Sequence, residues 1–296
     1  MKILIVGAKG QLGVDLMTAC RSIGLDADGA DLPECDITAL DSLRRTMRPE
    51  ANYTVVINAA AYTAVDGAET DADTAFAVNS HGVGHLASLC AALDTPLIHV
   101  STDYVFDGWQ VRPYRPSDPT SPRGVYGKSK AAGEGVLRDA LHQHVIVRTS
   151  WLYGVHGQNF VKTMLHHGRQ RDELRVVDDQ IGCPTYSRDL AAALLKIAQF
   201  VTKNAAGWGI YHYSNEGAVT WYAFARKIFA LAGIYDQFKV QEIVPILSHQ
   251  YPTPAPRPHY SVLDCSSLDE TFGITRRSWD AALREMLAEL YSLAAV

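Results

Sequence analysis

An apolar run at the amino terminus is followed at once by a glycine-rich turn, and these two features restrict the fold most. Residues 2–6 read KILIV, residues 7–13 read GAKGQLG, and a helical pattern continues through Leu16 and Cys20. A buried strand, a glycine turn and a helix form the start of a βαβ unit. Glycines there let the backbone approach a pyrophosphate, to which the helix N-terminus offers unpaired N–H groups. We therefore expect a nucleotide-binding α/β fold; a purely structural turn is the alternative.

Apolar runs and helical patterns continue to alternate up to about residue 154. The expected strands cover residues 25–30, 53–57, 96–100 and 145–148, and the expected helices 39–47, 73–93 and 126–141. Beyond residue 155 the alternation is irregular, with helical patterns near 158–169, 188–202, 220–233 and 278–293 and short strands near 174–177, 209–213 and 241–245. We predict a Rossmann-like doubly wound parallel sheet in an NAD(P)-binding domain, residues 1–154. Residues 155–296 would form a smaller mixed α/β substrate-binding lobe, from which some segments return to the first domain.

Three of the expected strands end in small, hydroxyl-bearing or aromatic residues. These ends are residues 58–61 (NAAA), 101–104 (STDY) and 149–151 (TSW). The carboxyl ends of parallel strands meet at one edge of the sheet, where ligands bind in open α/β proteins. Small residues there let a cofactor lie against the strand. Asn79, in an otherwise apolar helix, is either a structural hydrogen-bonding group near the cofactor or exposed.

Asp31 is the positional candidate for binding the adenine ribose. An acid about 20 residues beyond the glycine turn can accept a hydrogen bond from a ribose hydroxyl. It is equally possible that Asp31 is a solvent-exposed loop residue that binds no ligand. No arginine follows Asp31 directly to hold a 2′-phosphate, which favours NADH, but Lys9 and arginines elsewhere leave NADPH open.

Tyr126 and Lys130 stand four residues apart at the start of an expected helix. Their side chains would therefore lie on one face, one turn apart. A phenol titrates near about 10, and a nearby cation favours the phenolate and lowers that pKa. The pair suits a proton donor, although this spacing also arises by chance at surface helices.

Composition excludes several classes of protein. The chain has 296 residues and a net charge of -5, which argues against a nucleic-acid partner because phosphate binding needs a basic face. It contains no run of about 18 apolar residues, so we expect no membrane span. The start lacks the features of a signal peptide. Its five scattered cysteines form no CxxC pair, which suits reduced thiols, and we expect a cytoplasmic protein.

The motifs together resemble the extended short-chain dehydrogenase/reductase family. Within it, five strings are similar to the subgroup that reduces dTDP-4-dehydrorhamnose: residues 58–66 (NAAAYTAVD), 101–108 (STDYVFDG), 148–154 (RTSWLYG), 179–185 (DQIGCPT) and 251–255 (YPTPA). The likeness runs from residue 1 to about 290. It implies an NAD(P)H-dependent oxidoreductase that reduces the 4-keto group of dTDP-4-dehydro-β-L-rhamnose to dTDP-L-rhamnose, the last step of dTDP-rhamnose biosynthesis.

The resemblance also implies roles for individual residues. Tyr126 would be the general acid, Lys130 would lower its pKa and hold the nicotinamide ribose, and Thr102 would donate a second hydrogen bond to the oxyanion. Asp103 and Trp151 match substrate-contacting positions, with a core tryptophan as the alternative for Trp151. The cofactor, NADPH or NADH, would be bound by Tyr126, Lys130 and by Gly7, Gly10, Gln11, Leu12, Gly13, Asp31, Asp36, Ile37, Ala59, Ala60 and Ala61.

Departures from the family pattern leave some matters open. Asp15 falls where some members place a glutamate that binds a bridging magnesium, but the other ligands have no clear match, so we predict no metal. Gly67 stands at a position where the family often has lysine. We expect a monomer or homodimer acting on a dTDP-sugar. The alternatives are reduction of another nucleotide-linked 4-keto-6-deoxy sugar and a non-catalytic cofactor-binding regulatory subunit. Dehydration is disfavoured because no glutamate adjoins Thr102.

Overall fold

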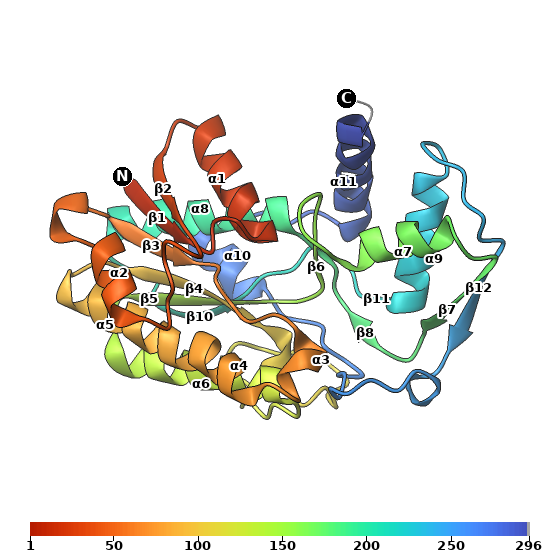
Figure 1. Cartoon of the computed structure of the whole chain (residues 1–296), viewed down its shortest axis with the longest axis horizontal. Helices are drawn as coiled ribbons and strands as arrows, with labels where there is room; N and C mark the ends of the chain where they lie inside the picture. Colours follow the sequence, from red (N-terminus) through yellow and green to blue (C-terminus); the bar gives the residue numbers. More distant parts are fainter. Residues whose placement is uncertain (295–296) are drawn as a thin grey trace.

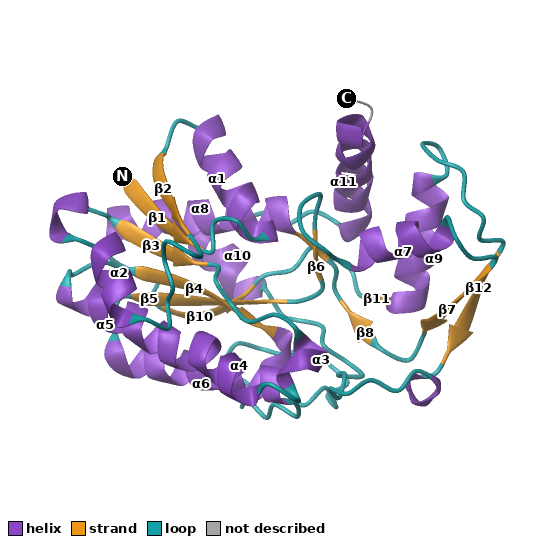
Figure 2. Ribbon diagram, in the orientation of Figure 1, coloured by secondary structure: helices purple, strands orange, loops and turns teal. Residues whose placement is uncertain are grey.

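Six parallel strands form the central sheet of the computed structural model, which describes residues 1–294 (Figures 1 and 2). In spatial order they are β10 (Gly209–His212), β5 (His144–Thr149), β4 (Leu97–Thr102), β3 (Val55–Asn58), β1 (Lys2–Val6) and β2 (Asp26–Ala30). The chain reverses its direction of sheet growth between β1 and β3, which is where doubly wound folds bind ligands. The predicted fold class is confirmed.

The strands at the centre of this sheet are buried on both faces. All four residues of β3 are inaccessible to solvent, as are Ile3, Leu4 and Ile5 of β1. Near-continuous apolar runs are typical of parallel strands covered by helices on both sides. The register places Val6 opposite Asn58. The glycine turn that follows β1 therefore lies beside the residues that follow β3.

Helices cover both faces of the sheet (Figure 1). One face packs against α1 (Gln11–Ser22), α8 (Ser187–Asn204) and α10 (Ser266–Phe272). The other packs against α2 (Leu40–Thr46), α5 (Val83–Ala92) and α6 (Val125–Ala140). Within residues 1–294, no helix combines the length and apolar character needed to cross a membrane.

The helix predicted over residues 73–93 is interrupted. It consists of α4 (Ala72–Phe76), a π-helical segment (Ala77–Gly82) and α5, and it is preceded by the short helix α3 (Val65–Ala68). Asn79 lies in the π-helical segment, where its Nδ2 donates to the Tyr62 carbonyl and to the Ser129 hydroxyl, each at 3.0 Å. π-Helical turns are frequently found at functional sites. Asn79 is thus a buried hydrogen-bonding group that ties this segment to α6.

The smaller lobe contains three helices and three pairs of short strands. The helices are α7 (Phe160–Gly168), α9 (Trp221–Ala232) and α11 (Trp279–Ala294). The pairs are β6 (Leu152–Tyr153) with β9 (Thr185–Tyr186), β8 (Ile181–Gly182) with β11 (Val219–Thr220), and β7 (Glu173–Val177) with β12 (Glu242–Ile246). The segments predicted at 188–202 and 209–213 correspond to α8 and β10. Strand β10 is part of the main sheet, and α8 packs against one face of that sheet.

The proline-rich segment after residue 250 runs without helix and crosses back to the first half. Ala255 N donates to the Asp66 carboxylate, and Tyr260 N donates to the Gly108 carbonyl. Each proline removes a donor and fixes φ, which prevents a helix here. This crossing joins the smaller lobe to the loops at the carboxyl edge of the sheet.

Candidate active site

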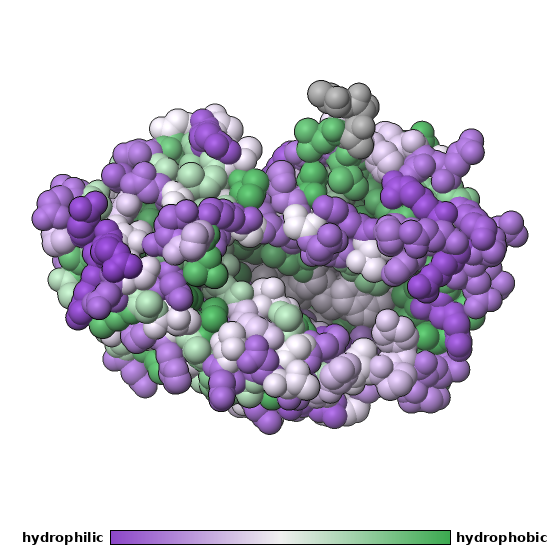
Figure 3. Space-filling model, viewed as in Figure 1, coloured by the Kyte–Doolittle hydropathy of each residue, from purple (hydrophilic) through white to green (hydrophobic). Residues whose placement is uncertain are grey.

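A cavity of about 910 Å³ lies at the carboxyl edge of the sheet, over the point where β1 and β3 diverge. In the space-filling view the molecule is hollowed between its two halves (Figure 3). Every predicted site residue lines this cavity: Gly7, Gly10, Gln11, Leu12, Gly13, Asp31, Asp36, Ile37, Ala59, Ala60, Ala61, Thr102, Asp103, Tyr126, Lys130 and Trp151. The fold thus brings together segments that are far apart in the sequence.

The glycine turn leaves a cradle that a larger residue would fill. Gly7 has a φ of +84°, and a Cβ built on it would lie 2.5 Å from the amide nitrogen of Ala60. A Cβ on Gly13 would overlap the Gly7 carbonyl oxygen. Only glycine suits both positions, because one needs a left-handed backbone and the other a close approach of two segments. The turn leads directly into α1, whose first N–H groups are available to an anion.

Two acids border the far end of this cavity. Asp31 accepts hydrogen bonds from the backbone N–H groups of Lys9 (2.7 Å) and Leu32 (2.8 Å). Asp36 accepts from the backbone and hydroxyl of Thr38, at 2.8 and 2.7 Å. Carboxylate oxygens have further lone pairs, so Asp31 retains acceptor capacity toward a ligand hydroxyl. The Asp36 carboxylate serves mainly to hold its own turn.

Thr102 and Tyr126 face the cavity from β4 and α6. The Thr102 hydroxyl donates to the Asp103 carboxylate at 3.1 Å and accepts from the backbone of Tyr104 at 3.2 Å. Burial raises the pKa of Tyr126 strongly, and the Thr102 hydroxyl opposes that rise. The expected lowering of this pKa by Lys130 is not seen in this arrangement, in which desolvation of the phenolate dominates and the Lys130 amino group is bonded to the Val100 carbonyl. Tyr126 is therefore a firmly protonated phenol.

Lys130 lies one turn further along α6 and is almost fully buried. Its amino group donates to the Val100 carbonyl at 2.7 Å and lies 3.3 Å from Nε2 of His99. Burial lowers the pKa of Lys130 to about 8, against the opposing effect of the Glu134 carboxylate. The amino group thus turns toward β4, although the residue also lines the cavity.

Asp103 contributes a buried carboxyl group to the same cavity. Within the described part of the chain, its Oδ2 forms no hydrogen bond of good geometry, although the Ser261 hydroxyl lies close enough to lower the pKa of the carboxyl. Burial raises the pKa of Asp103 to about 6 from an ordinary value of 3.8. An unpartnered buried polar atom is costly, and such atoms often mark a position completed by a ligand. Asp103 is therefore available to a polar group in the cavity.

Trp151 lies between β5 and β6 in a left-handed conformation, with a φ of +47°. Its indole stacks on that of Trp221 with the centroids 3.4 Å apart and the planes 7° from parallel. A non-glycine residue at positive φ is uncommon and persists where the surroundings hold it. The stack holds Trp151, half-buried, against the smaller lobe while it lines the cavity. The sequence did not indicate Trp221 as its partner.

A second cavity of about 690 Å³ adjoins the first and shares Tyr104 with it. Its lining combines cationic side chains with aromatic ones, namely Arg171, Arg175, Arg257, Phe160, Trp221 and Tyr251. Arg257 donates to the Asp66 carboxylate at 2.6 Å and to the Tyr104 hydroxyl at 3.0 Å. Arg257 belongs to the proline-rich segment after residue 250, and no pattern in the sequence indicated that this segment reaches the site.

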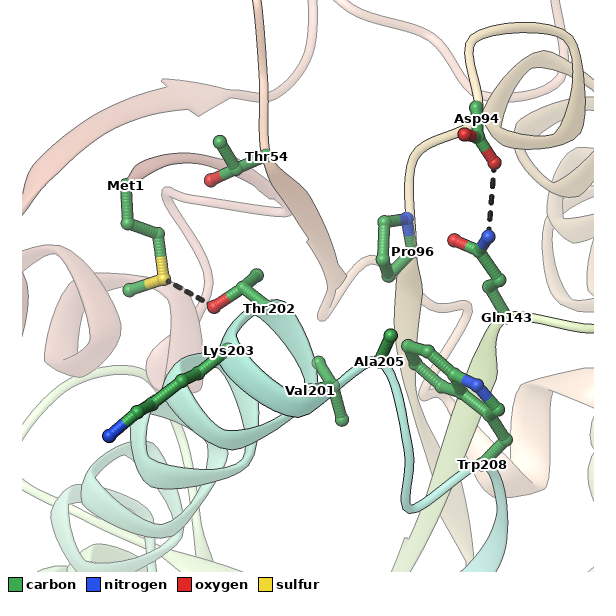
Figure 4. A pocket seen from close by; sticks show the side chains of 10 residues that line it. All are labelled: Met1, Thr54, Asp94, Pro96, Gln143, Val201, Thr202, Lys203, Ala205 and Trp208. Atoms are coloured by element: carbon green, nitrogen blue, oxygen red, sulfur yellow. Dashed lines mark hydrogen bonds between the residues drawn. The ribbon is translucent and has the colours of Figure 1, made fainter.

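A hollow at the opposite edge of the sheet contains none of these groups (Figure 4). Its volume is about 490 Å³, and its lining includes Thr54, Pro96, Gln143 and Trp208, each of which precedes a strand. Ligands of open α/β sheets bind at the carboxyl edge rather than at this amino edge. We therefore assign the candidate site to the first cavity.

Asp15 is buried and forms a close hydrogen bond with the Ser187 hydroxyl. Burial raises its pKa. Among residues 1–294, no group of three or more histidine, cysteine or acidic side chains is placed to hold a metal ion. The carboxylate of Asp15 thus joins α1 to the start of α8.

Comparison with known proteins identifies the family. Residues 1–292 match the family model described as the RmlD substrate binding domain. The dTDP-4-dehydrorhamnose reductase of Aggregatibacter actinomycetemcomitans is 43% identical, over 97% of this chain and 98% of that protein.

Solved structures give the same result. A dTDP-4-dehydrorhamnose reductase from Clostridium acetobutylicum superposes with a TM-score of 0.91 and 38% identity, covering 98% of this chain and 99% of that one. The enzyme from Bacillus anthracis, solved in complex with NADP, gives a TM-score of 0.90 and 36% identity, over 98% of this chain and all of that one. The chain belongs to the dTDP-4-dehydrorhamnose reductase family.

Proposed function

We propose that this chain is an NAD(P)H-dependent oxidoreductase that reduces the 4-keto group of dTDP-4-dehydro-β-L-rhamnose, giving dTDP-L-rhamnose in dTDP-rhamnose biosynthesis. The observation that carries the proposal is the single cavity shared by the glycine turn, Thr102, Tyr126 and Lys130. Family membership supports the same reaction, since full-length relatives are dTDP-4-dehydrorhamnose reductases.

The residues present fit a nicotinamide dinucleotide. The cradle at Gly7 and Gly13 admits a pyrophosphate, and the N-terminus of α1 complements its charge. Ala59, Ala60 and Ala61 leave room beside β3. We propose that Asp31 accepts from the adenine ribose, and that Gly10, Gln11, Leu12, Asp36 and Ile37 complete this half of the site. When bound, the dinucleotide supplies the hydride.

Tyr126, Thr102 and Lys130 would serve the carbonyl oxygen. Tyr126 stays protonated at neutral pH, so it can donate its proton to an oxyanion as that charge develops. The Thr102 hydroxyl would donate a second hydrogen bond once released from Asp103. Lys130 would hold ribose hydroxyls and, when charged, stabilise the phenolate left on Tyr126. The unpartnered Oδ2 of Asp103 and the indole of Trp151 would bind the sugar.

We propose that the second cavity accepts the nucleotide half of the substrate. Its three arginines, Arg171, Arg175 and Arg257, outnumber the two lining carboxylates, Asp66 and Glu173, which leaves positive charge for a diphosphate. Trp221 and Tyr251 supply rings on which a base can stack. Tyr104 lies between this cavity and Tyr126, with the two phenol rings 5.5 Å apart and edge-on. A nucleotide in the second cavity would therefore place its sugar near the candidate general acid.

We also propose a division into domains, an oligomeric state and a cellular setting. We divide the chain into a cofactor-binding domain, residues 1–154 together with α8, β10 and α10, and a substrate-binding lobe made of the remaining later segments. We propose a monomer or homodimer with no structural metal. The five cysteines are buried free thiols, which supports a reducing, cytoplasmic setting.

Replacing Tyr126 with phenylalanine tests the assignment of the general acid. The ring keeps its place, while the donated proton is lost. Turnover of the keto sugar should fall about 10²–10⁴-fold, and the dissociation constant of NADPH or NADH, measured by fluorescence titration, should stay within about twofold of wild type. Unchanged turnover would remove Tyr126 from the mechanism.

A further inference from the structure

A chain of three buried side chains lies behind the cavity, and sequence analysis assigned no role to two of them. Asn58 ends β3, His99 lies in β4, and Lys130 belongs to α6; each is at most 2% exposed. Asn58 Nδ2 is 3.1 Å from His99 Nδ1, and His99 Nε2 is 3.3 Å from Lys130 Nζ. Among residues 1–294, these groups form hydrogen bonds only with one another and with neighbouring backbone, so their donor and acceptor roles can be worked out.

The backbone fixes the orientation of the Asn58 amide. Its Oδ1 accepts a hydrogen bond from the N–H of Ala60 at 3.0 Å. Rotating the amide by half a turn would place two donors against each other there. The amide nitrogen must therefore face His99 and donate to Nδ1. A neutral imidazole that accepts at Nδ1 carries its proton on Nε2, so the N–H of His99 points at Lys130.

The contact with Lys130 then has only one favourable arrangement. An ammonium group has three donors and no acceptor, so it cannot hydrogen-bond to an N–H group. A neutral amine has a lone pair that can accept from His99 while its own N–H donates to the Val100 carbonyl at 2.7 Å. The observed geometry satisfies all four partners only if Lys130 is uncharged.

We propose that His99, oriented by Asn58, is a positioning residue that holds Lys130 as a neutral amine against β4 and disfavours its charged form there. Protonation of Lys130 would convert its lone pair into a further N–H group. That group would face the N–H of His99, and two donors cannot share a hydrogen bond. The charged amino group would then turn from His99 toward the cavity, where Tyr126 lies. His99 thus couples the charge of Lys130 to its direction. The consequence for catalysis rests on the proposed function, whereas the coupling itself does not.

The other charged groups around Lys130 are accounted for. Glu134 lies one turn along α6 and favours the ammonium, but its carboxylate is paired with Arg148 of β5. Asp103, beside β4, faces Tyr126 rather than Lys130. Complete burial, the larger cause, lowers the pKa of His99, so the ring stays neutral even beside an uncharged Lys130.

The tautomer of His99 tests the proposal without substrate or catalysis. Long-range ¹H–¹⁵N correlation spectra of the ¹⁵N-histidine protein at pH 8.5 distinguish an Nε2–H ring from an Nδ1–H ring. The His99 signals are assigned by their loss in His99→Gln. We expect the Nε2–H tautomer. An Nδ1–H or doubly protonated ring would overturn the proposal, because Lys130 could then donate to Nε2 or would face an imidazolium.

The pKa of Lys130 provides a second readout. It is measured from the pH titration of the ¹³Cε signal of labelled lysine, assigned with Lys130→Met. His99→Gln offers an amide oxygen that can accept from an ammonium, so it should raise the pKa of Lys130 by about one pH unit. An unchanged or lower value would contradict the proposal. His85→Gln, a half-buried histidine bonded to the Ile37 carbonyl, is the matched control and should leave Lys130 unaffected.

Discussion

Arg148 and Glu134 form a two-point ion pair that is buried between β5 and α6. The guanidinium donates to the two carboxylate oxygens at 2.9 and 2.6 Å, and both side chains are at most 3% exposed. The Ser101 hydroxyl donates to the same carboxylate at 2.5 Å. The pair therefore joins the helix that carries Tyr126 and Lys130 to two strands of the sheet.

Glu134→Gln should destabilise the protein by about 3–5 kcal/mol, because it leaves the Arg148 guanidinium buried without a counter-charge. The free energy of unfolding, obtained from urea titrations, checks this value. Asp41→Asn breaks an exposed pair with Arg44 and should leave the unfolding midpoint nearly unchanged. Equal effects of the two substitutions would show that burial of the Glu134 pair has no special importance.

Asp103 should make stability depend on pH. The pKa of its carboxyl is about 6 in the folded chain, above the ordinary 3.8. Because the folded-state pKa is raised, the contribution of the Asp103 carboxyl to stability is fully present below about pH 3.8. This contribution is lost as the pH rises through about 6. Asp103→Asn removes this loss. Relative to wild type, the variant should gain roughly 2 kcal/mol in free energy of unfolding between pH 4 and pH 7. A difference that does not change with pH would refute the shift.

Trp221→Ala should weaken substrate binding while sparing the cofactor. The substitution removes the ring on which Trp151 stacks, and such a pair contributes about 0.5–1.5 kcal/mol beyond its buried area. We expect the KM for the nucleotide sugar to rise up to about tenfold, with the dissociation constant of the dinucleotide unchanged. Trp208→Ala, at the amino edge of the sheet, is the matched control and should change neither constant (Figure 4).

Short-range patterns predicted much of the fold. The strands beside the glycine turn, the residues after β3 and β4, and the Tyr126–Lys130 spacing all follow from periodicity within one or two elements. Parallel topology then brings these segments to one edge. This is why every predicted site residue lines a single cavity. The π-helical segment around Asn79 was missed because its residues continue a helical pattern in the sequence.

The groups that were missed depend on long-range contacts. Trp221 meets Trp151, Arg257 meets Asp66, and Arg148 meets Glu134 only after the chain has folded. No local pattern indicates such pairs. His99 is visible in the sequence as a single histidine within an apolar strand. Its role becomes apparent only once Asn58 and Lys130 lie on either side of it. The direction of the pKa shift of Tyr126 was missed because it is set by burial, which the sequence does not show.

Direct assay of the wild-type protein tests the central claim. The purified chain is incubated with freshly generated dTDP-4-dehydro-β-L-rhamnose and with NADPH or NADH in turn, and cofactor oxidation is followed by absorbance. A parallel reaction contains the 4-keto sugar with the opposite configuration at the neighbouring ring carbons. We predict oxidation of at least one cofactor with the L-rhamnose precursor, formation of dTDP-L-rhamnose, and little turnover of the other sugar. Cofactor binding without reduction of either sugar would contradict the account.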